Sequence, residues 1–240
     1  MRTTRRADEL RPLKITCGVV KNADGSALIE MGDTHVICTA KLVMGVPQWL
    51  RGAKRGWLTA EYSMLPASTT TRTPREATQG RQGGRTMEIQ RLIGRSLRAV
   101  TDLERLGERT MYIDCDVLQA DGGTRCAGIS GAYVALYHAL VALRDAERLA
   151  ELPLFEDVAA VSVGVVDGRE LLDLDYEEDS AAALDMNVVA TGSGRLIEVQ
   201  ATAEGEPFPR DTLDRLLDLA VAGNGSIVAV QQAVLAATSD

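Results

Sequence analysis

The chain has 240 residues, of which 45% are hydrophobic and 4% aromatic, and its formal net charge is −8. This length allows a substantial core, in one domain or in two closely joined halves, and the scarcity of aromatic residues favours close helix–sheet packing over a β-sandwich. We find no run of 18 uncharged apolar residues and no apolar segment after the basic N-terminus, so we predict a cytoplasmic protein without a transmembrane helix or a secretory signal.

The first third of the chain is predicted to form strands. Short apolar runs separated by turn residues indicate four of them, over residues 13–20, 27–30, 34–43 and 57–65. The first three can form a meander. A segment rich in Thr, Pro, Gly and Arg follows at residues 66–84, and a loop of this length in a compact domain is usually functional or disordered.

A long amphipathic helix is predicted over residues 85–107. Its apolar residues recur at steps of four and three, which places them on one buried stripe. Those residues are Ile89, Ile93, Leu97, Val100 and Leu103, and Arg91, Arg95 and Arg98 form a second stripe at the same spacing. A strand over residues 110–119 and a helix over about 128–148 follow.

The second half of the chain repeats this order of strands and then helices. Four strands are predicted over residues 158–168, 170–176, 185–194 and 195–205, followed by two helices over about 210–221 and 226–237. Each half therefore consists of several strands followed by two helices. This grouping predicts an α+β fold with two βα halves, and it argues against a doubly wound parallel sheet.

Basic and acidic residues are unevenly distributed along the chain. Residues 1–110 contain 19 Lys and Arg against 11 Asp and Glu, whereas residues 111–240 contain 7 against 23. The first half therefore has a net charge of +8 and the second half −16. Most of the basic residues in the first half are arginines, whose forked guanidinium suits phosphate, so the asymmetry predicts an anionic partner. The alternative is that the two charged halves face each other within the fold or in an oligomer.

Cysteine and histidine chemistry is not indicated. The four cysteines have no paired spacing and are expected to be free thiols in a reducing compartment; they are Cys17, Cys38, Cys115 and Cys126. The two histidines, His35 and His138, lie in a predicted strand and a predicted apolar helix, with no nucleophile motif and no metal-ligand spacing. Carboxylates and arginines are therefore the candidates for any catalytic chemistry.

Two short glycine motifs are candidate phosphate sites. The sequence GGRT at residues 83–86 and the sequence DGGTR at residues 121–125 each precede a predicted helix and each place an arginine at its start. Helix N-termini bind anions through free backbone N–H groups, and glycines allow close approach. Arginine adds a permanently charged forked donor. Either motif alone is common loop chemistry, but together they indicate a phosphate site.

Two aspartates are candidate metal ligands or general acids. Asp179 closes an acidic run, and Asp185 opens an apolar strand after the short connection SAAAL. Two carboxylates converging from the ends of such a connection can hold Mg²⁺ together. Alternatively, one can act as a general acid while the other binds the metal ion. The alternative is that the acidic run is a solvated surface.

Long motifs in this chain closely resemble those of the bacterial ribonuclease PH family. They occur in order and without large gaps from about residue 2 to the C-terminal helix. They are EYSMLP, TRTPREATQGRQGGRTMEIQRLIGRSLR, IDCDVLQADGGTR, VAAVSVGVVDG, EEDSAAALDMNVV and IEVQATAEGEPF. The resemblance implies one ribonuclease PH domain over residues 1–240, with a fold similar to the second domain of ribosomal protein S5. Its basic part covers about 1–110 and its acidic part about 111–240.

The resemblance also implies a function. The family members are phosphate-dependent 3′→5′ exoribonucleases that trim the 3′ ends of tRNA precursors, use inorganic phosphate in place of water and release nucleoside diphosphates. The resemblance also implies roles in tRNA and ribosomal RNA processing, RNA binding and nucleotidyl transfer, with a reverse reaction that adds nucleotides. The resemblance further implies Mg²⁺ as cofactor and a cytoplasmic hexamer built as a trimer of dimers, with no membrane partner.

The site residues of the family fall on particular positions of this sequence. The implied phosphate-binding residues are Arg85, Gly123, Thr124 and Arg125. The essential carboxylates match Asp179 and Asp185, as catalytic residues and as metal ligands. The arginine loop that contacts the tRNA acceptor stem corresponds to the segment with Arg72 and Arg75.

Two positions depart from the family pattern. Ala67 stands where relatives often have an arginine, which affects the contact with RNA, and Cys126 replaces a more common threonine in a small-for-small change that we expect to be tolerated. One alternative function is a catalytically inactive RNA-binding ring subunit related to the exosome core, but such a subunit loses the arginines or aspartates that this chain retains. Another is a small-molecule kinase on a similar fold, which needs a longer glycine loop.

Overall fold

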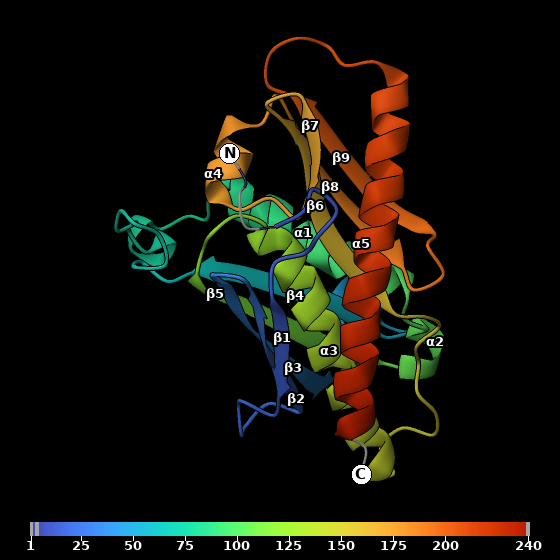
Figure 1. Ribbon diagram of the computed structural model, residues 1–240. Coiled ribbons are helices and arrows are strands. Elements are labelled where there is room, and N and C mark those ends of the chain that lie inside the picture. Colours follow the sequence, from blue (N-terminus) through green and yellow to red (C-terminus); the bar gives the residue numbers. More distant parts are fainter. Residues whose placement is uncertain (1, 3–4, 239–240) are drawn as a thin grey trace.

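Two β-sheets, with helices packed between and beside them, make up the protein (Figure 1). The structure is a computed structural model that describes residues 2 and 5–238, so residues 1, 3, 4, 239 and 240 of the predicted domain lie outside the described residues. The first sheet has the strand order β1-β2-β3-β5-β4 and the second the order β7-β6-β8-β9. This arrangement confirms the predicted α+β fold.

The first sheet contains the predicted meander. Its strands are β1 (Leu13–Cys17), β2 (Gly25–Met31), β3 (Thr34–Met44), β4 (Trp57–Met64) and β5 (Arg109–Gln119). Strands β1, β2, β3 and β5 pair antiparallel, and β4 pairs parallel with β5. Strands β2 and β3 alternate buried and less buried residues because one face packs on the core. Two short 3-10 helices, Gln48–Leu50 and Glu76–Gln79, lie in the connections, the second inside the segment predicted as a loop.

The second sheet is antiparallel throughout, and its interior strand β6 is buried on both faces. Its strands are β6 (Val158–Val166), β7 (Arg169–Leu172), β8 (Leu184–Thr191) and β9 (Leu196–Ala203). Helix α3 (Thr124–Asp145) packs against β6, and so does α5 (Arg210–Ala237). This explains why β6 is an almost continuous apolar run, VAAVSVGVV, without the alternation of a half-exposed strand.

Helix α3 lies between the two sheets, with β2 and β3 on one side and β6 on the other (Figure 1). It is buried around most of its circumference, and small residues allow this close packing. A Cβ atom on Gly131 would lie 2.7 Å from Ile29 Cγ2. The predicted range of about 128–148 was wrong at its start, because α3 begins at Thr124, directly after the glycine pair.

Three other helix predictions are also corrected by the structure. The helix predicted over 85–107 is divided into α1 (Gly84–Ala99) and α2 (Leu103–Leu106), because Asp102 caps a new helix by accepting from the backbone N–H groups of Glu104 and Arg105. The two helices predicted near the C-terminus are one helix, α5. There Asn224, between two glycines, is buried and donates from Nδ2 to the Val188 carbonyl at 3.2 Å, so tertiary contact holds the helix together.

Helix α4 (Tyr176–Ala181) was not predicted. It begins with a capping box, in which Asp175 accepts from the Glu178 backbone N–H and Glu178 accepts from the Asp175 backbone N–H. The strand predicted over 170–176 ends at Leu172, since Asp173 has a positive φ of 54°. The acidic composition of this segment hid both features from pattern reasoning.

Part of the charge asymmetry is neutralised within the fold. Arg2 and Arg5, at the basic N-terminus, both form ion pairs with the Glu178 carboxylate, at 2.6 and 3.3 Å. Arg11 pairs with Asp173 at 2.8 Å. The alternative in which oppositely charged parts face each other is therefore correct for these three arginines. It does not account for the arginines of residues 66–85.

Two helices are long and apolar enough to cross a membrane, judged by length and composition alone. They are α3 and α5, whose apolar windows are 78% and 39% buried inside the fold. The burial of α3 is that of a core helix. The absence of a transmembrane helix stays a prediction.

The continuity of α5 can be tested with two glycines that lie two residues apart. A Cβ on Gly223 would lie 2.6 Å from Leu172 Cδ1, whereas nothing lies within 4 Å of a Cβ on Gly225. We expect Gly225→Ala to raise the free energy of unfolding by up to about 1 kcal/mol through helix propensity. Gly223→Ala should lower it by roughly 1–3 kcal/mol through overpacking. Urea denaturation at one protein concentration measures both, and destabilisation by Gly225→Ala would contradict a continuous helix.

Candidate active site

The turn before α3 presents unpaired backbone amides at the helix N-terminus. Gly122 and Gly123 have φ values of 73° and 65°, and Gly123 is the N-cap residue of α3. Among the described residues, no protein acceptor binds the N–H groups of Gly122, Gly123, Thr124 or Arg125. A Cβ on Gly122 would lie 2.7 Å from the Leu174 carbonyl oxygen, so this turn requires glycine. Free amides and the helix dipole together suit an anion.

Tyr62 contacts one of the predicted phosphate residues and lies near the charges of two others. Its hydroxyl donates to Thr124 Oγ1 at 2.9 Å, and its side chain projects from β4 into the buried interior. Burial raises the pKa of Tyr62, while the nearby charges of Arg85 and Arg125 oppose the increase. The structure therefore brings Thr124 and both arginines to one place. Tyr62 was not predicted, although it occupies a buried position in the strand that contains the EYSMLP motif.

Two side chains that the sequence reasoning missed hold the Arg125 guanidinium. Arg125 Nη1 donates to Gln200 Oε1 at 2.9 Å and lies 3.3 Å from Glu88 Oε1. Gln200 Nε2 also donates to Glu88 Oε1 at 3.1 Å, so the three groups form a closed network. Glu88 lies on α1 and Gln200 on β9. No sequence signal connects residues this far apart in the chain.

Arg85 lies in the first turn of α1 and is exposed. In the part of the chain that the structure describes, it has neither an ion pair nor a hydrogen bond from its side chain. The start of α1 is fixed by Glu76, whose Oε1 accepts from the Gly83 N–H at 3.1 Å and from Thr86 Oγ1 at 2.7 Å. Arg85 is therefore held by its backbone, and its guanidinium can bind a ligand.

The two predicted carboxylates approach each other beside Arg125. Asp179 is exposed on α4, and Asp185 is half-buried at the start of β8. Burial, and next the charge of Asp179, raise the pKa of Asp185 to about 6, and Arg125 partly offsets the rise. Asp185 Oδ1 is buried without a hydrogen-bond partner among the described residues. The two aspartates are therefore close enough to interact electrostatically, and their roles as metal ligands and catalytic residues stay a prediction.

The aspartate pair fits a hard cation such as Mg²⁺. Both groups offer oxygen ligands, and a cation would relieve their repulsion and bind the unpaired Asp185 oxygen. Within residues 2 and 5–238, no group of three or more His, Cys, Asp and Glu side chains is arranged for a metal ion. The ion would therefore keep several water ligands, as Mg²⁺ commonly does.

The arginine loop, residues 66–83, projects from the body of the protein beside the first sheet (Figure 1). Arg72 and Arg75 are both exposed. The base of the loop is tied to the sheet, since the Ala120 N–H donates to the Ser68 carbonyl at 2.9 Å. An open cleft of about 940 Å³ is lined by Arg75, Arg81 and Arg85. The arginine loop and Arg85, one of the predicted phosphate-binding residues, therefore line the same cleft.

Cys126 is compatible with its position. Its thiol is buried at 1% exposure and donates to Asn187 Oδ1 at 3.2 Å. Burial raises the pKa of Cys126 to about 12, so the thiol stays protonated and able to donate. A threonine hydroxyl could make the same contact. The effect of Ala67 stays a prediction.

Sequence comparison connects this site with known proteins. Residues 9–142 match the model of the 3′ exoribonuclease family, domain 1, and residues 158–223 match domain 2 of that family. Ribonuclease PH of Mycobacterium sp. (strain KMS) is 59% identical over 229 residues, which cover 95% of this chain and 88% of that protein. Ribonuclease PH of Mycobacterium sp. (strain JLS) matches to the same extent.

Solved structures share the fold at lower identity. A chain of the Archaeoglobus fulgidus exosome with RNA bound to the active site has a TM-score of 0.79 and 24% identity, covering 94% of this chain and 90% of that chain. Rice (Oryza sativa) Rrp46 has a TM-score of 0.77 and 18% identity, covering 95% and 97%. At these identities the similarity concerns the fold alone.

The repulsion between the aspartates predicts a pH-dependent stability cost in the metal-free protein. Because the folded pKa of Asp185 is about 6 and its ordinary value is 3.8, the folded state binds this proton more tightly than the unfolded chain. Stability therefore falls as pH rises from about 4 to about 6, and the cost is fully present above pH 6. We expect Asp185→Asn to raise the free energy of unfolding at pH 8 by on the order of 1–3 kcal/mol, allowing for partial screening by solvent.

Urea denaturation in EDTA measures this effect. At pH 4 most of the difference between the variant and the unmodified protein should disappear, because Asp185 is then largely neutral in the folded state and only partly ionised in the unfolded chain. Asp218→Asn, at an exposed position on α5, serves as the control and should change stability by less than about 0.5 kcal/mol at either pH. An equal effect of Asp185→Asn at pH 4 and pH 8 would contradict the electrostatic explanation.

Proposed function

The chain belongs to the 3′ exoribonuclease family, and from this membership and the site geometry we propose how it acts on RNA. It is a phosphate-dependent 3′→5′ exoribonuclease. The observation that carries this conclusion is the 59% identity to Ribonuclease PH over 95% of the chain. The proposed substrates are the 3′ ends of tRNA precursors.

The proposed phosphate site lies between the starts of α1 and α3. Inorganic phosphate is bound by Arg85, Arg125 and the Thr124 hydroxyl, together with the free amides of the turn at Gly123. The support is their convergence around Tyr62 and the absence of a protein acceptor for these amides among the described residues. Two guanidinium groups and a helix N-terminus match the charge and the several acceptor oxygens of phosphate.

The proposed reaction is an in-line displacement at the last phosphodiester of the RNA. An oxygen of inorganic phosphate forms a bond to the phosphorus, and the bond to the 3′ oxygen of the penultimate ribose breaks. That oxygen takes up a proton, and the products are a nucleoside diphosphate and an RNA one nucleotide shorter. Positioning and charge neutralisation supply most of the catalysis. Because the exchanged bonds are similar, nucleoside diphosphates in excess drive the reverse reaction, which adds nucleotides.

Asp179 and Asp185 are the proposed catalytic carboxylates and the residues that would hold Mg²⁺. When bound there, the ion supplies charge neutralisation at the scissile phosphate. One of the two carboxyl groups relays the proton to the leaving 3′ oxygen. The support is their proximity to each other and to Arg125, together with the unpaired buried oxygen of Asp185.

RNA is proposed to reach the site along the arginine loop. Arg72 and Arg75 are exposed and form no ion pair within the described part of the chain, so their charges are free to bind the backbone of the tRNA acceptor stem. The cleft lined by Arg75 and Arg81 also includes Arg85, so it joins the loop to one of the proposed phosphate-binding residues. The loop thus accounts for part of the basic charge that the fold does not neutralise internally.

A hexamer in the cytoplasm is the proposed state of the protein. Large apolar side chains remain exposed at the end of β3, on the 3-10 helix that follows it and on β5, which favours burial against another subunit; they are Val43, Met44, Trp49 and Tyr112. The four cysteines are free, which suits a reducing compartment. Light scattering of the purified protein measures the oligomeric state directly.

An inactive ring subunit is the weaker alternative. Its support is limited to the fold that this chain shares with an exosome chain at 24% identity and with rice Rrp46 at 18% identity. The chain retains the arginines and aspartates of the proposed site, and its similarity to Ribonuclease PH is much higher.

The function is tested with a tRNA that carries extra 3′ nucleotides, incubated with and without inorganic phosphate. Release of nucleoside diphosphates should depend on phosphate, and EDTA should suppress it if Mg²⁺ is needed. We expect Arg125→Ala to reduce this release by about 10²-fold or more, because one charged donor to the phosphate is lost. RNA binding measured by filter retention should change little.

Arg148→Ala is the matched control, since it removes an exposed arginine just beyond the opposite end of α3. It should leave phosphate-dependent release within about twofold of the unmodified protein. Unchanged activity of Arg125→Ala would remove this arginine from the mechanism, and release without phosphate would contradict phosphorolysis.

The arginine loop predicts a change in salt dependence. Replacing Arg72 and Arg75 together by Ala should weaken tRNA binding and reduce the slope of log affinity against log salt by roughly 1.5–2, in proportion to two lost phosphate contacts. Binding titrations from low to moderate salt measure the slope. An unaltered slope would show that the loop does not contact the RNA backbone.

A further inference from the structure

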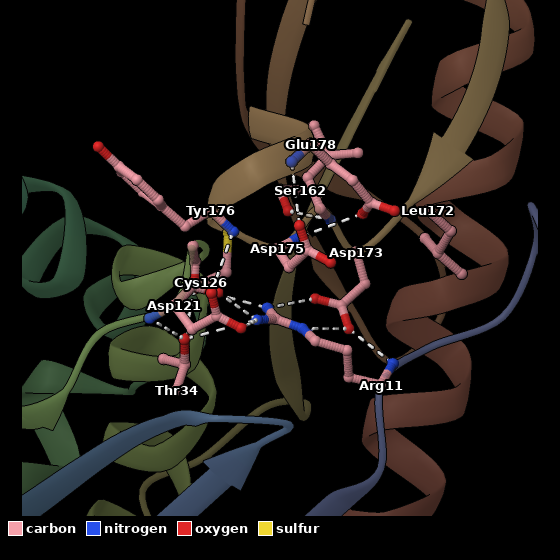
Figure 2. Close-up of polar contacts among 12 residues, drawn as sticks. Arg11, Thr34, Asp121, Cys126, Ser162, Leu172, Asp173, Asp175, Tyr176 and Glu178 are labelled. Atoms are coloured by element: carbon pink, nitrogen blue, oxygen red, sulfur yellow. Dashed lines mark hydrogen bonds and ion pairs between the residues drawn. The ribbon is translucent and has the colours of Figure 1, made fainter. Parts of the chain in front are cut away.

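Arg11 is a buried arginine that is not among the proposed site residues. It belongs to the segment before β1, only 6% of it is exposed, and its partner Asp173 is 1% exposed. The Arg11 backbone N–H and Nε donate to Asp173 Oδ2 at 2.8 and 3.1 Å, and Nη2 donates to Asp173 Oδ1 at 2.8 Å (Figure 2). The two bonds from Nε and Nη2 fix the plane and direction of the guanidinium, and the backbone bond holds the carboxylate in place.

The free side of the guanidinium faces the glycine turn before α3. Arg11 Nη1 donates to the Asp121 carbonyl, and Nη2 lies 3.5 Å from the Gly122 carbonyl oxygen. Thr34 supports the same turn, because its hydroxyl donates to the Gly122 carbonyl at 2.6 Å and accepts from the Asp121 N–H at 2.9 Å (Figure 2). Both carbonyl groups of the turn are therefore bound from one side.

The direction of these carbonyls determines where the amides point. In a planar trans peptide, the C=O and the following N–H point in opposite directions. Binding the carbonyls of Asp121 and Gly122 therefore directs the N–H groups of Gly122 and Gly123 away from Arg11. The approach is close, since a Cβ on Gly123 would lie 3.1 Å from Arg11 Nη2.

We infer that Arg11 and Thr34 are positioning residues for the phosphate substrate. Held by Asp173, Arg11 binds the carbonyl side of the turn at Gly122 and Gly123 and so presents its amide side to the anion. A guanidinium is needed here because it must bind a carboxylate on one edge and carbonyl oxygens on the other, which an ammonium group cannot do. This inference rests on the phosphate site of the proposed function.

A purely structural role would give a different result. Asp173 follows β7, and Arg11 precedes β1, so the pair also joins the two sheets. If this were its whole role, loss of the contacts would lower stability without a selective effect on phosphate. The two roles are separated by measuring phosphate binding, RNA binding and stability on the same variants.

The test uses Thr34→Val and Arg11→Lys in the full chain. Thr34→Val keeps the shape of a buried side chain and removes only the hydroxyl. Thr101→Val is its matched control, because Thr101 is also buried and its hydroxyl donates to the Leu97 carbonyl at 2.7 Å, away from the turn. The dissociation constant for inorganic phosphate is measured by calorimetry, and the KM values for phosphate and RNA and the kcat by diphosphate release.

We expect both variants to weaken phosphate binding and raise the phosphate KM by roughly tenfold, as for the loss of one hydrogen bond to a charged group. The RNA KM should stay within about twofold, and Thr101→Val should leave the phosphate constants unchanged at a similar loss of stability. Equal phosphate constants in Thr34→Val, Arg11→Lys and Thr101→Val would overturn the inference. Because calorimetry requires no turnover, phosphate binding without phosphorolysis would refute the proposed function alone, and no phosphate binding by the unmodified protein would overturn both.

Discussion

The burial of α3 between two sheets is the constraint on which the rest of the structure depends. The helix contacts β2 and β3 on one side and β6 on the other, and small residues such as Gly131 allow this close approach. Its N-terminus consequently lies where the two halves of the chain meet. The arginine loop and α1 reach this point from the first half, and Asp179, Asp185 and Gln200 reach it from the second.

The arginines of this protein fall into two groups with different roles. Arg2, Arg5 and Arg11 are paired with carboxylates of the second half and join the parts of the fold. Arg72, Arg75 and Arg85 are exposed and remain available to an anion. Arg125 differs from both groups, since Glu88 and Gln200 hold its guanidinium at the site where we propose that phosphate binds. Charge counts alone do not distinguish these roles, because pairing is decided by distance in the folded state.

The aspartate pair shows how a site can oppose stability. Burial and the charge of Asp179 raise the pKa of Asp185, so the folded metal-free protein keeps two carboxylates together at a free-energy cost. A bound cation would remove that cost.

The sequence by itself determined the α+β class, most strands, the two glycine motifs and the family resemblance, because these depend on local periodicity and on long contiguous motifs. It did not determine that α5 is continuous across Asn224, that α4 forms in the acidic run, or that α3 starts at Thr124. The capping box of α4, Asp175 with Glu178, is a local signal that was overlooked within the acidic run. The continuity of α5 depends instead on buried contacts that local patterns do not encode. Tyr62, Glu88, Gln200 and Arg11 were missed for the same reason. Each lies beside the glycine turn or Arg125 only because the two sheets close around α3, and that closure places residues from distant parts of the chain within hydrogen-bond distance.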